Sequence, residues 1–302
     1  MSRLKSCIIA ALLALVFSGA NADLAHKQVG GFGGVPLTVV ETGNKDGPGI
    51  LLIHGFGQAS MVFRMQLESE LAKSFHIVAF DMRGHGLSGK PWQPDLIEPS
   101  EVWAGDVAAV IAATNLIKPV IVGWSYGGFV ISDYVRHFGT ENIAGINLVG
   151  SLGGLVPRSP FMPSANLQEI LENSRKSRSV IFDENVEAAL NTAISFYTPN
   201  MTEKDKQAQF AMGLLMPSYV KRAMAGRDLN NTDIVSQVDV PVLLSRGSRD
   251  IFMPANDTEV ALRTLSDVKL SFYEDTGHLP FYQHHKRYNQ ELADFVSDIT
   301  EK

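Results

Sequence analysis

The sequence is almost without cysteine, since Cys7 is the one such residue among 302. A chain with a single cysteine forms no internal disulfide and builds no metal or redox site from paired thiols. No run of lysine or arginine occurs, and the net charge of −6 gives no reason to expect a nucleic-acid surface. With 45% hydrophobic and 19% charged residues, the chain has the composition of a globular protein that a hydrophobic core stabilises.

Long hydrophobic runs are also missing, and the longest one covers residues 7–17 near the N-terminus. Eleven residues are too few to span a bilayer as a stable helix. Arg3 and Lys5 precede the run, and a small-x-small cleavage pattern follows it. These features predict a secretory signal peptide at 1–22 and an exported, periplasmic or secreted, mature chain of 23–302. An uncleaved N-terminal anchor is the alternative.

Short β-branched runs alternate with longer amphipathic segments along the rest of the chain. Strands are predicted at 36–41, 49–54, 75–80, 119–122, 143–149, 241–245 and 268–273. Helices are predicted at 58–73, 98–115, 256–265 and 286–299, and in the segment that ends at 138. This alternation predicts an α/β fold with a mostly parallel, doubly wound sheet.

The alternation stops between about 152 and 238, where helical segments rich in Met, Phe and Tyr predominate. This segment is predicted to be a helical cap inserted over the carboxyl edge of the sheet, where ligands bind in open α/β folds. Its Met and aromatic positions are expected to divide between cap core and pocket lining. They are Phe161, Met162, Phe196, Tyr197, Phe210, Met212 and Met216.

The most informative motif is Gly123-Trp124-Ser125-Tyr126-Gly127, which follows a predicted strand and opens a predicted helix. In that context G-x-S-x-G forms a strained turn that exposes the serine hydroxyl, and glycines are needed because the turn is tight. The motif alone recurs by chance, so its meaning depends on partners. A serine nucleophile needs a base, and the base needs an acid that orients it.

Both partners are present in the order expected of such a hydrolase. Asp250 and His278 follow Ser125, each in a loop directly after a predicted strand. Parallel strands bring these loops to one edge of the sheet. An oxyanion hole is predicted from the backbone N–H groups of Tyr126 and of Phe56, which lies between two glycines in another loop after a strand.

With these motifs in order, the chain resembles the α/β-hydrolase superfamily over about residues 35–295. It is similar to the cap-bearing branch of esterases, lactonases and non-haem haloperoxidases. The segments that carry the resemblance are 54–57, 81–88, 123–128 and the loops of Asp250 and His278. An elbow serine, in place of the elbow aspartate of related epoxide hydrolases and dehalogenases, implies acyl chemistry.

Several neighbouring residues could compete for these roles. Asp257 and Asp275 are rivals of Asp250, but one lies in a predicted helix and the other lies three residues before His278. His284 and His285 are rivals of His278 and are expected to be solvated. Five other polar residues are expected to be structural: His54, Asp81, Arg83, His85 and Asp106.

The sequence therefore predicts a serine hydrolase that cleaves a carboxylester or lactone through Ser125, His278 and Asp250. The substrate is expected to be a small to medium hydrophobic molecule, and neither a metal nor an organic cofactor is expected. Perhydrolysis of the haloperoxidase type would use the same triad and stays open. A non-catalytic ligand receptor on a hydrolase scaffold is the alternative from another class. The oligomeric state is not predicted.

Overall fold

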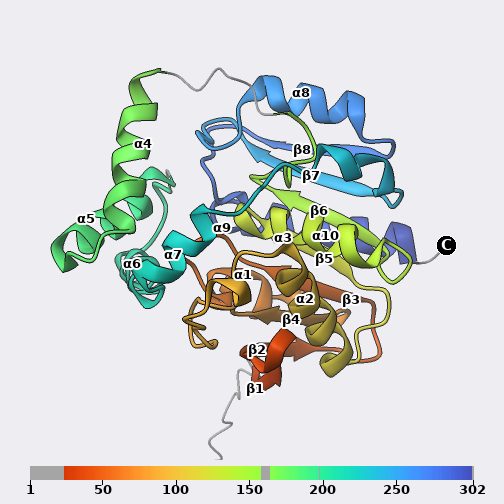
Figure 1. Cartoon of the computed structure of the whole chain (residues 1–302). Helices are drawn as coiled ribbons and strands as arrows, with labels where there is room; N and C mark the ends of the chain where they lie inside the picture. The colour runs from red at the N-terminus through yellow and green to blue at the C-terminus, as the bar shows by residue number, and fades with distance from the viewer. Residues whose placement is uncertain (1–23, 158–163, 197, 301–302) are drawn as a thin grey trace, which may run out of the picture.

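The computed structural model describes residues 24–157, 164–196 and 198–300 (Figure 1). The predicted signal peptide and the cap residues Phe161, Met162 and Tyr197 lie outside the described residues. Within these ranges, none of the helices has the length and apolar character needed to cross a bilayer.

Eight strands form one sheet in the order β1-β2-β4-β3-β5-β6-β7-β8. Strand β2 runs antiparallel to both β1 and β4, and the other neighbouring pairs are parallel. The predicted α/β class with a mostly parallel sheet is thus confirmed. The strands are β1 (Ala25–Gly30), β2 (Pro36–Gly43), β3 (Gly49–Ile53), β4 (His76–Phe80), β5 (Val120–Trp124), β6 (Gly145–Val149), β7 (Val242–Gly247) and β8 (Val268–Tyr273).

Helices cover both faces of the sheet because its central strands are apolar on both sides (Figure 1). In β3, for example, Leu51 and Ile53 join one hydrophobic cluster, while Ile50 and Leu52 join the other. The first cluster is covered by α2 (Ser100–Thr114), α3 (Tyr126–Phe138) and α8 (Ala255–Thr264). The second is covered by α1 (Arg64–Leu67), α9 (Pro280–Gln283) and α10 (His285–Thr300).

The prediction of one continuous helix at 58–73 is wrong. The chain forms three short pieces there: a 3-10 turn at Ser60–Phe63, α1, and a second 3-10 turn at Glu70–Lys73. At the start of the first turn, the Ser60 N–H bonds to the Asp81 carboxylate. The Ser69 side chain then accepts the N–H of Leu71 and starts a new turn.

Among the described residues between β6 and β7, in the segment predicted to form the cap, there are four α-helices. They are α4 (Ser164–Ser177), α5 (Phe182–Ser195), α6 (Glu203–Leu215) and α7 (Ser218–Ala225), followed by a 3-10 turn at Thr232–Gln237. We call these helices the cap. In Figure 1 they gather at one side of the molecule, apart from the two helical layers that flank the sheet.

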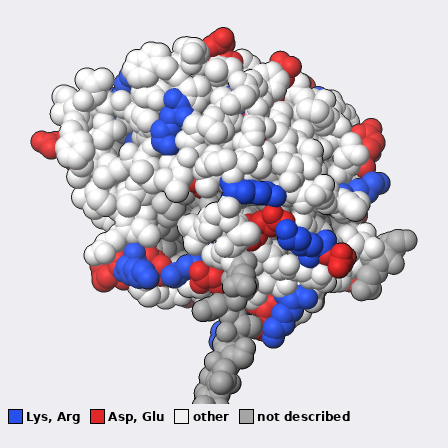
Figure 2. All heavy atoms as spheres, turned by 90° about the horizontal axis from the view of Figure 1, so that it is seen from below, with Lys and Arg blue, Asp and Glu red and all other residues white. Residues whose placement is uncertain are grey.

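Positive and negative side chains are intermixed on the face shown in Figure 2, which is the underside of the view in Figure 1. Most of the coloured groups there have an opposite charge beside them, and large areas between them are uncharged. Such a mixed surface gives no long-range attraction to a polyanion on this face.

Candidate active site

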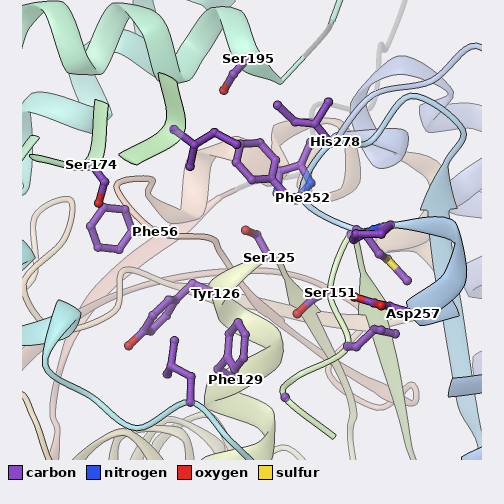
Figure 3. Close-up of a pocket in the computed structure, with 18 of the residues that line it drawn as sticks. Phe56, Ser125, Tyr126, Phe129, Ser151, Ser174, Ser195, Phe252, Asp257 and His278 are labelled. Carbon is purple, nitrogen blue, oxygen red and sulfur yellow. The ribbon is translucent and has the colours of Figure 1, made fainter. Parts of the chain in front are cut away.

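Ser125 lies at the junction of β5 and α3, in a backbone conformation that few side chains adopt. Its φ of 54° and ψ of −114° fall outside the regions that are open to most L-residues. The glycines on either side permit this turn, because a Cβ at Gly123 would lie 2.6 Å from the carbonyl oxygen of Gly127. A Cβ at Gly127 would in turn lie 2.3 Å from the carbonyl oxygen of Ile53. The sharp turn presents the serine side chain to the cavity beneath the cap (Figure 3).

Asp250 and His278 are joined by a hydrogen bond of 2.8 Å between Oδ2 and Nδ1. Both side chains are almost completely buried, and each lies in a loop at the carboxyl end of its strand, β7 or β8. The backbone N–H of Phe252 donates a second hydrogen bond to the other carboxylate oxygen of Asp250. Because Asp250 binds Nδ1 of His278, Nε2 is the ring nitrogen that remains available for proton transfer. Ser125 and His278 line the same cavity.

Two aromatic residues that sequence reasoning did not single out for this purpose hold the His278 loop in place. The indole N–H of Trp124 donates to the carbonyl oxygen of His278 at 2.9 Å. The backbone N–H of His278 donates to the carbonyl oxygen of Phe196, which directly follows α5 of the cap. The rings of Trp124, Phe196 and Phe252 surround the imidazole, with centroids 4.7 to 5.6 Å away.

Gly150 is a further residue whose role the sequence did not reveal. It follows β6 with a φ of 55°, and a Cβ there would lie 2.8 Å from Nδ1 of His278 and 2.9 Å from Oδ2 of Asp250. The missing side chain leaves the space in which these two groups form their hydrogen bond.

The backbone N–H groups of Phe56 and Tyr126, from which the sequence predicts an oxyanion hole, have no acceptor in regular secondary structure. Tyr126 is the first residue of α3, so its N–H has no acceptor within the helix. The N–H of Phe56 donates no hydrogen bond within the described part of the chain. The loop of Phe56 approaches the elbow closely, since a Cβ at Gly55 would lie 3.1 Å from the Cβ of Ser125.

The side chain of Tyr126 is fixed by a buried ion pair that the sequence did not indicate. Arg227, which follows α7 of the cap, donates to the Tyr126 hydroxyl at 2.7 Å and to the Asp133 carboxylate at 2.6 Å. Its guanidinium also lies over the Trp103 ring, 4.8 Å from the centroid. Burial raises the pKa of Asp133 to about 6, even though Arg227 opposes that shift. The network joins the cap to α3, the helix that begins at Tyr126.

The cavity above Ser125 has a volume of about 960 Å³ and carries both apolar and polar side chains. Figure 3 shows Ser125 near its centre, with Phe56, Tyr126, Phe129 and Phe252 around it. Polar groups from the cap also face it, including Asn173, Ser174, Asn191, Thr192 and Ser195. Of the described cap residues expected to divide between core and pocket, Phe196 both lines the cavity and belongs to the second hydrophobic cluster, and Met216 belongs to the first cluster.

The rival residues occupy other positions. Asp257 lines the cavity from α8, and Asp275 is exposed and pairs with Arg249 at 2.7 Å. His284 is exposed between α9 and α10, and the ring of His285 contacts the carbonyl oxygen of Tyr282. Among these aspartates, Asp250 is the one whose carboxylate contacts Nδ1 of His278 in the described part of the chain.

The residues expected to be structural are buried and make hydrogen bonds within the protein. The Asp81 carboxylate accepts the backbone N–H groups of Ser60 and Leu87. Arg83 makes two bonds to Asp106, at 2.6 and 2.7 Å, and both side chains are buried. His54 accepts the N–H of Met82 and contacts the carbonyl oxygen of Gly55, while burial lowers its pKa to about 4.

Comparison with known proteins identifies the family. The family model described as alpha/beta hydrolase fold matches residues 48–285. The chain belongs to this family. Among solved structures, an esterase from a Rhodococcus species is 28% identical, with a TM-score of 0.81, and the match covers 91% of this chain and 99% of the esterase.

Two curated relatives extend this likeness beyond esterases alone. The non-heme haloperoxidase of Rhodococcus erythropolis is 25% identical over 82% of this chain and 91% of its own length. The bifunctional esterase/perhydrolase of Acinetobacter calcoaceticus is 25% identical over 73% of this chain and 81% of its own length. Family membership and these relatives support a hydrolase that acts on ester-type substrates.

Proposed function

We propose that the protein is a serine hydrolase that cleaves carboxylesters or lactones through an acyl-enzyme. The observation that carries this proposal is the strained serine at the elbow beside the buried Asp250–His278 pair, all at one cavity. A serine held in such a turn beside an oriented histidine has the arrangement that nucleophilic acyl transfer requires.

In the first half of the reaction, Nε2 of His278 accepts the proton of Ser125 as the serine oxygen attacks the acyl carbon. The carbonyl oxygen becomes an oxyanion, which accepts hydrogen bonds from the N–H groups of Phe56 and Tyr126. Asp250 stabilises the imidazolium through the bond to Nδ1. The carbon–oxygen bond of the ester then breaks, and His278 returns the proton to the departing alcohol.

In the second half, water attacks the acyl-enzyme and gives its proton to His278. The same oxyanion hole stabilises the second tetrahedral intermediate, whose collapse releases the acid and restores the Ser125 hydroxyl. These reaction steps require neither a metal nor an organic cofactor. A lactone reacts by the same steps, with the alcohol remaining attached to the acid.

A pair of serine variants tests this proposal. Ser125→Ala is expected to reduce hydrolysis of p-nitrophenyl esters by at least about 1000-fold, because it removes the nucleophile. Ser195→Ala is the control, since Ser195 lines the same cavity and, among the described residues, its hydroxyl bonds only to the Thr192 carbonyl. A fluorophosphonate should label Ser125 alone. Full activity in Ser125→Ala, or a label on another residue, would contradict the mechanism, whereas a wild-type protein that hydrolyses none of the esters would favour the non-catalytic receptor.

Perhydrolysis is a second candidate, favoured by the bifunctional esterase/perhydrolase relative. Hydrogen peroxide would replace water as the nucleophile on the acyl-enzyme, so that a peracid and the free serine form. Formation of peracid from an ester and peroxide, lost in Ser125→Ala, would establish it. Hydrolysis without any peracid at high peroxide concentration would rule it out.

Export through the predicted signal peptide is part of the proposal. The basic start, the short apolar run and the small-x-small pattern of residues 1–22 support it. The mass of the protein recovered from the periplasm or medium should correspond to a chain that begins at residue 23. Recovery of the full-length chain in the membrane fraction would indicate an uncleaved anchor instead.

A further inference from the structure

A second, much smaller cavity adjoins the one above Ser125, and we call it the side chamber. It has a volume of about 30 Å³ and shares Phe56, Ser177 and Thr192 with the wall of the larger cavity. Its other lining residues are Gly57, Gln58, Ala188, Ala189, Gln209, Gly213 and Lys221. The chamber therefore lies where the loop of residues 56–58 meets α5, α6 and α7 of the cap.

Lys221 lines this chamber, and no carboxylate among the described residues pairs with it. The residue is 4% exposed, and within the described ranges its Nζ makes neither an ion pair nor a hydrogen bond. Burial lowers the pKa of Lys221 to about 8. A buried cation of this kind is costly unless a group inside the protein, or one that binds to it, compensates the charge.

His85 does not compensate the positive charge of Lys221. Lys221 acts electrostatically on His85, whose pKa burial lowers to about 3, so that its imidazole is neutral at physiological pH. The Nε2 atom of His85 is buried and has no hydrogen-bond partner among the described residues.

Two glutamines add unused polar groups to the same chamber. Gln58 is 2% exposed and Gln209 is 3% exposed, and the side-chain oxygen of each is buried without a partner in the described part of the chain. Neither amide is held by a hydrogen bond there, so each can turn either its oxygen or its NH₂ group toward a ligand. Lys221 and the two amides can together present several N–H donors to one small group.

We propose that the side chamber binds a small monoanionic group through Lys221, Gln58 and Gln209. One source is the carboxylate at the far end of an acyl substrate whose ester lies at Ser125, and this case rests on the proposed function. The other source is a free anion of about the size of halide or formate. The chamber has room for a group of this size, because a single water needs about 10 to 15 Å³ of the same measure.

The substrate source is tested with p-nitrophenyl half-esters of dicarboxylic acids and neutral p-nitrophenyl esters of equal chain length. At the chain length that reaches the chamber, kcat/KM should be about tenfold or more higher for the half-ester. Lys221→Met should abolish this preference and leave the hydrolysis of the neutral esters in place. Lys206→Met is the matched control, because Lys206 is on α6 of the cap and its side chain is 48% exposed.

The free-ion source is tested by thermal unfolding in formate, chloride or bromide at constant ionic strength. Each small anion that binds should raise the Tm of the wild-type protein and not that of Lys221→Met. Gln209→Met provides a second variant that keeps the cation but removes one amide, and it should weaken either effect.

The outcomes separate this inference from the proposed function. A half-ester preference that depends on Lys221 supports the substrate source, and an anion-dependent Tm that depends on Lys221 supports the free ion. If neither effect occurs in the wild-type protein, the anion site is overturned. If the neutral esters are not hydrolysed, the proposed function fails, while the Tm measurement still decides whether the chamber binds anions.

Discussion

At the scale of single residues, the hydrogen bond between Asp250 and His278 depends on the absence of a side chain at Gly150. This glycine has a φ of 55°, and the nearest atoms to an added Cβ are Nδ1 of His278 and Oδ2 of Asp250. A methyl group there would have to displace one partner of the pair. The histidine would then lose the orientation that general-base catalysis requires.

We expect Gly150→Ala to lower kcat for a p-nitrophenyl ester by about 100-fold, because a displacement of this size disrupts the geometry of the reacting groups. Gly34→Ala is the matched control. Gly34 also has a positive φ, 76°, but a Cβ there would meet no atom within 4 Å. Both variants bear the backbone cost of a left-handed alanine, about 1 to 2 kcal/mol. Equal activity of the two variants would show that Gly150 is not needed for the pair.

At the scale of elements, the cap and α3 are connected by the buried pair of Arg227 and Asp133. Removing one member of a buried ion pair leaves the other charge without compensation, which costs about 3 to 5 kcal/mol. We therefore expect Asp133→Asn to lower the free energy of unfolding by about 3 kcal/mol at pH 8. Denaturant titration measures this loss, and ester hydrolysis should fall with it because Arg227 also holds Tyr126.

Asp233→Asn is the control for that experiment, since Asp233 pairs with Arg136 at the same distance of 2.6 Å. The Asp233 side chain is 61% exposed, so we expect its loss to cost less than about 1 kcal/mol. Equal losses in the two variants would mean that burial of the Asp133 pair contributes nothing beyond the contact itself.

The elements also show which parts of the site the sequence could reveal. The elbow and the loops of Asp250 and His278 were predictable, because short motifs beside apolar strands fix both their conformation and their place at the sheet edge. The hydrogen bonds that Trp124 and Arg227 make to the site were not predictable, since each joins residues about 100 or more positions apart in the chain. Such contacts depend on how the cap and the strands pack, and local sequence carries no sign of them.

At the scale of the whole molecule, the central strands were predicted from their apolar and β-branched runs, but the first edge strand was not. Strand β1 was not predicted, because most of its side chains are exposed and its segment contains few β-branched residues. It is an edge strand that pairs with β2 alone. Charged groups help to hold this edge together.

Glu41 of β2 is the centre of that charged group. Its carboxylate bonds to Lys27 of β1, to Lys45 in the loop after β2, and to His76 of β4, each at 2.8 or 2.9 Å. Burial alone would raise the pKa of Glu41, but the hydrogen bonds from Lys27, Lys45 and His76 lower it to about 2. The folded protein therefore binds a proton at this site less readily than the unfolded chain does.

It follows that Glu41 stabilises the fold above about pH 4.5 and loses this contribution as the pH falls from 4.5 toward 2. We expect the contribution to be about 1 to 2 kcal/mol, because the Lys45 side chain is 69% exposed and solvent screens its charge. Glu41→Gln should lower the free energy of unfolding near pH 7 by this amount and flatten its dependence on pH below 4.5. Glu70→Gln, which removes a carboxylate that is 80% exposed, should leave the pH dependence of the free energy of unfolding below pH 4.5 unchanged. If Glu41→Gln and the wild-type protein lose stability in parallel between pH 4.5 and 2, the charged edge does not contribute to acid unfolding.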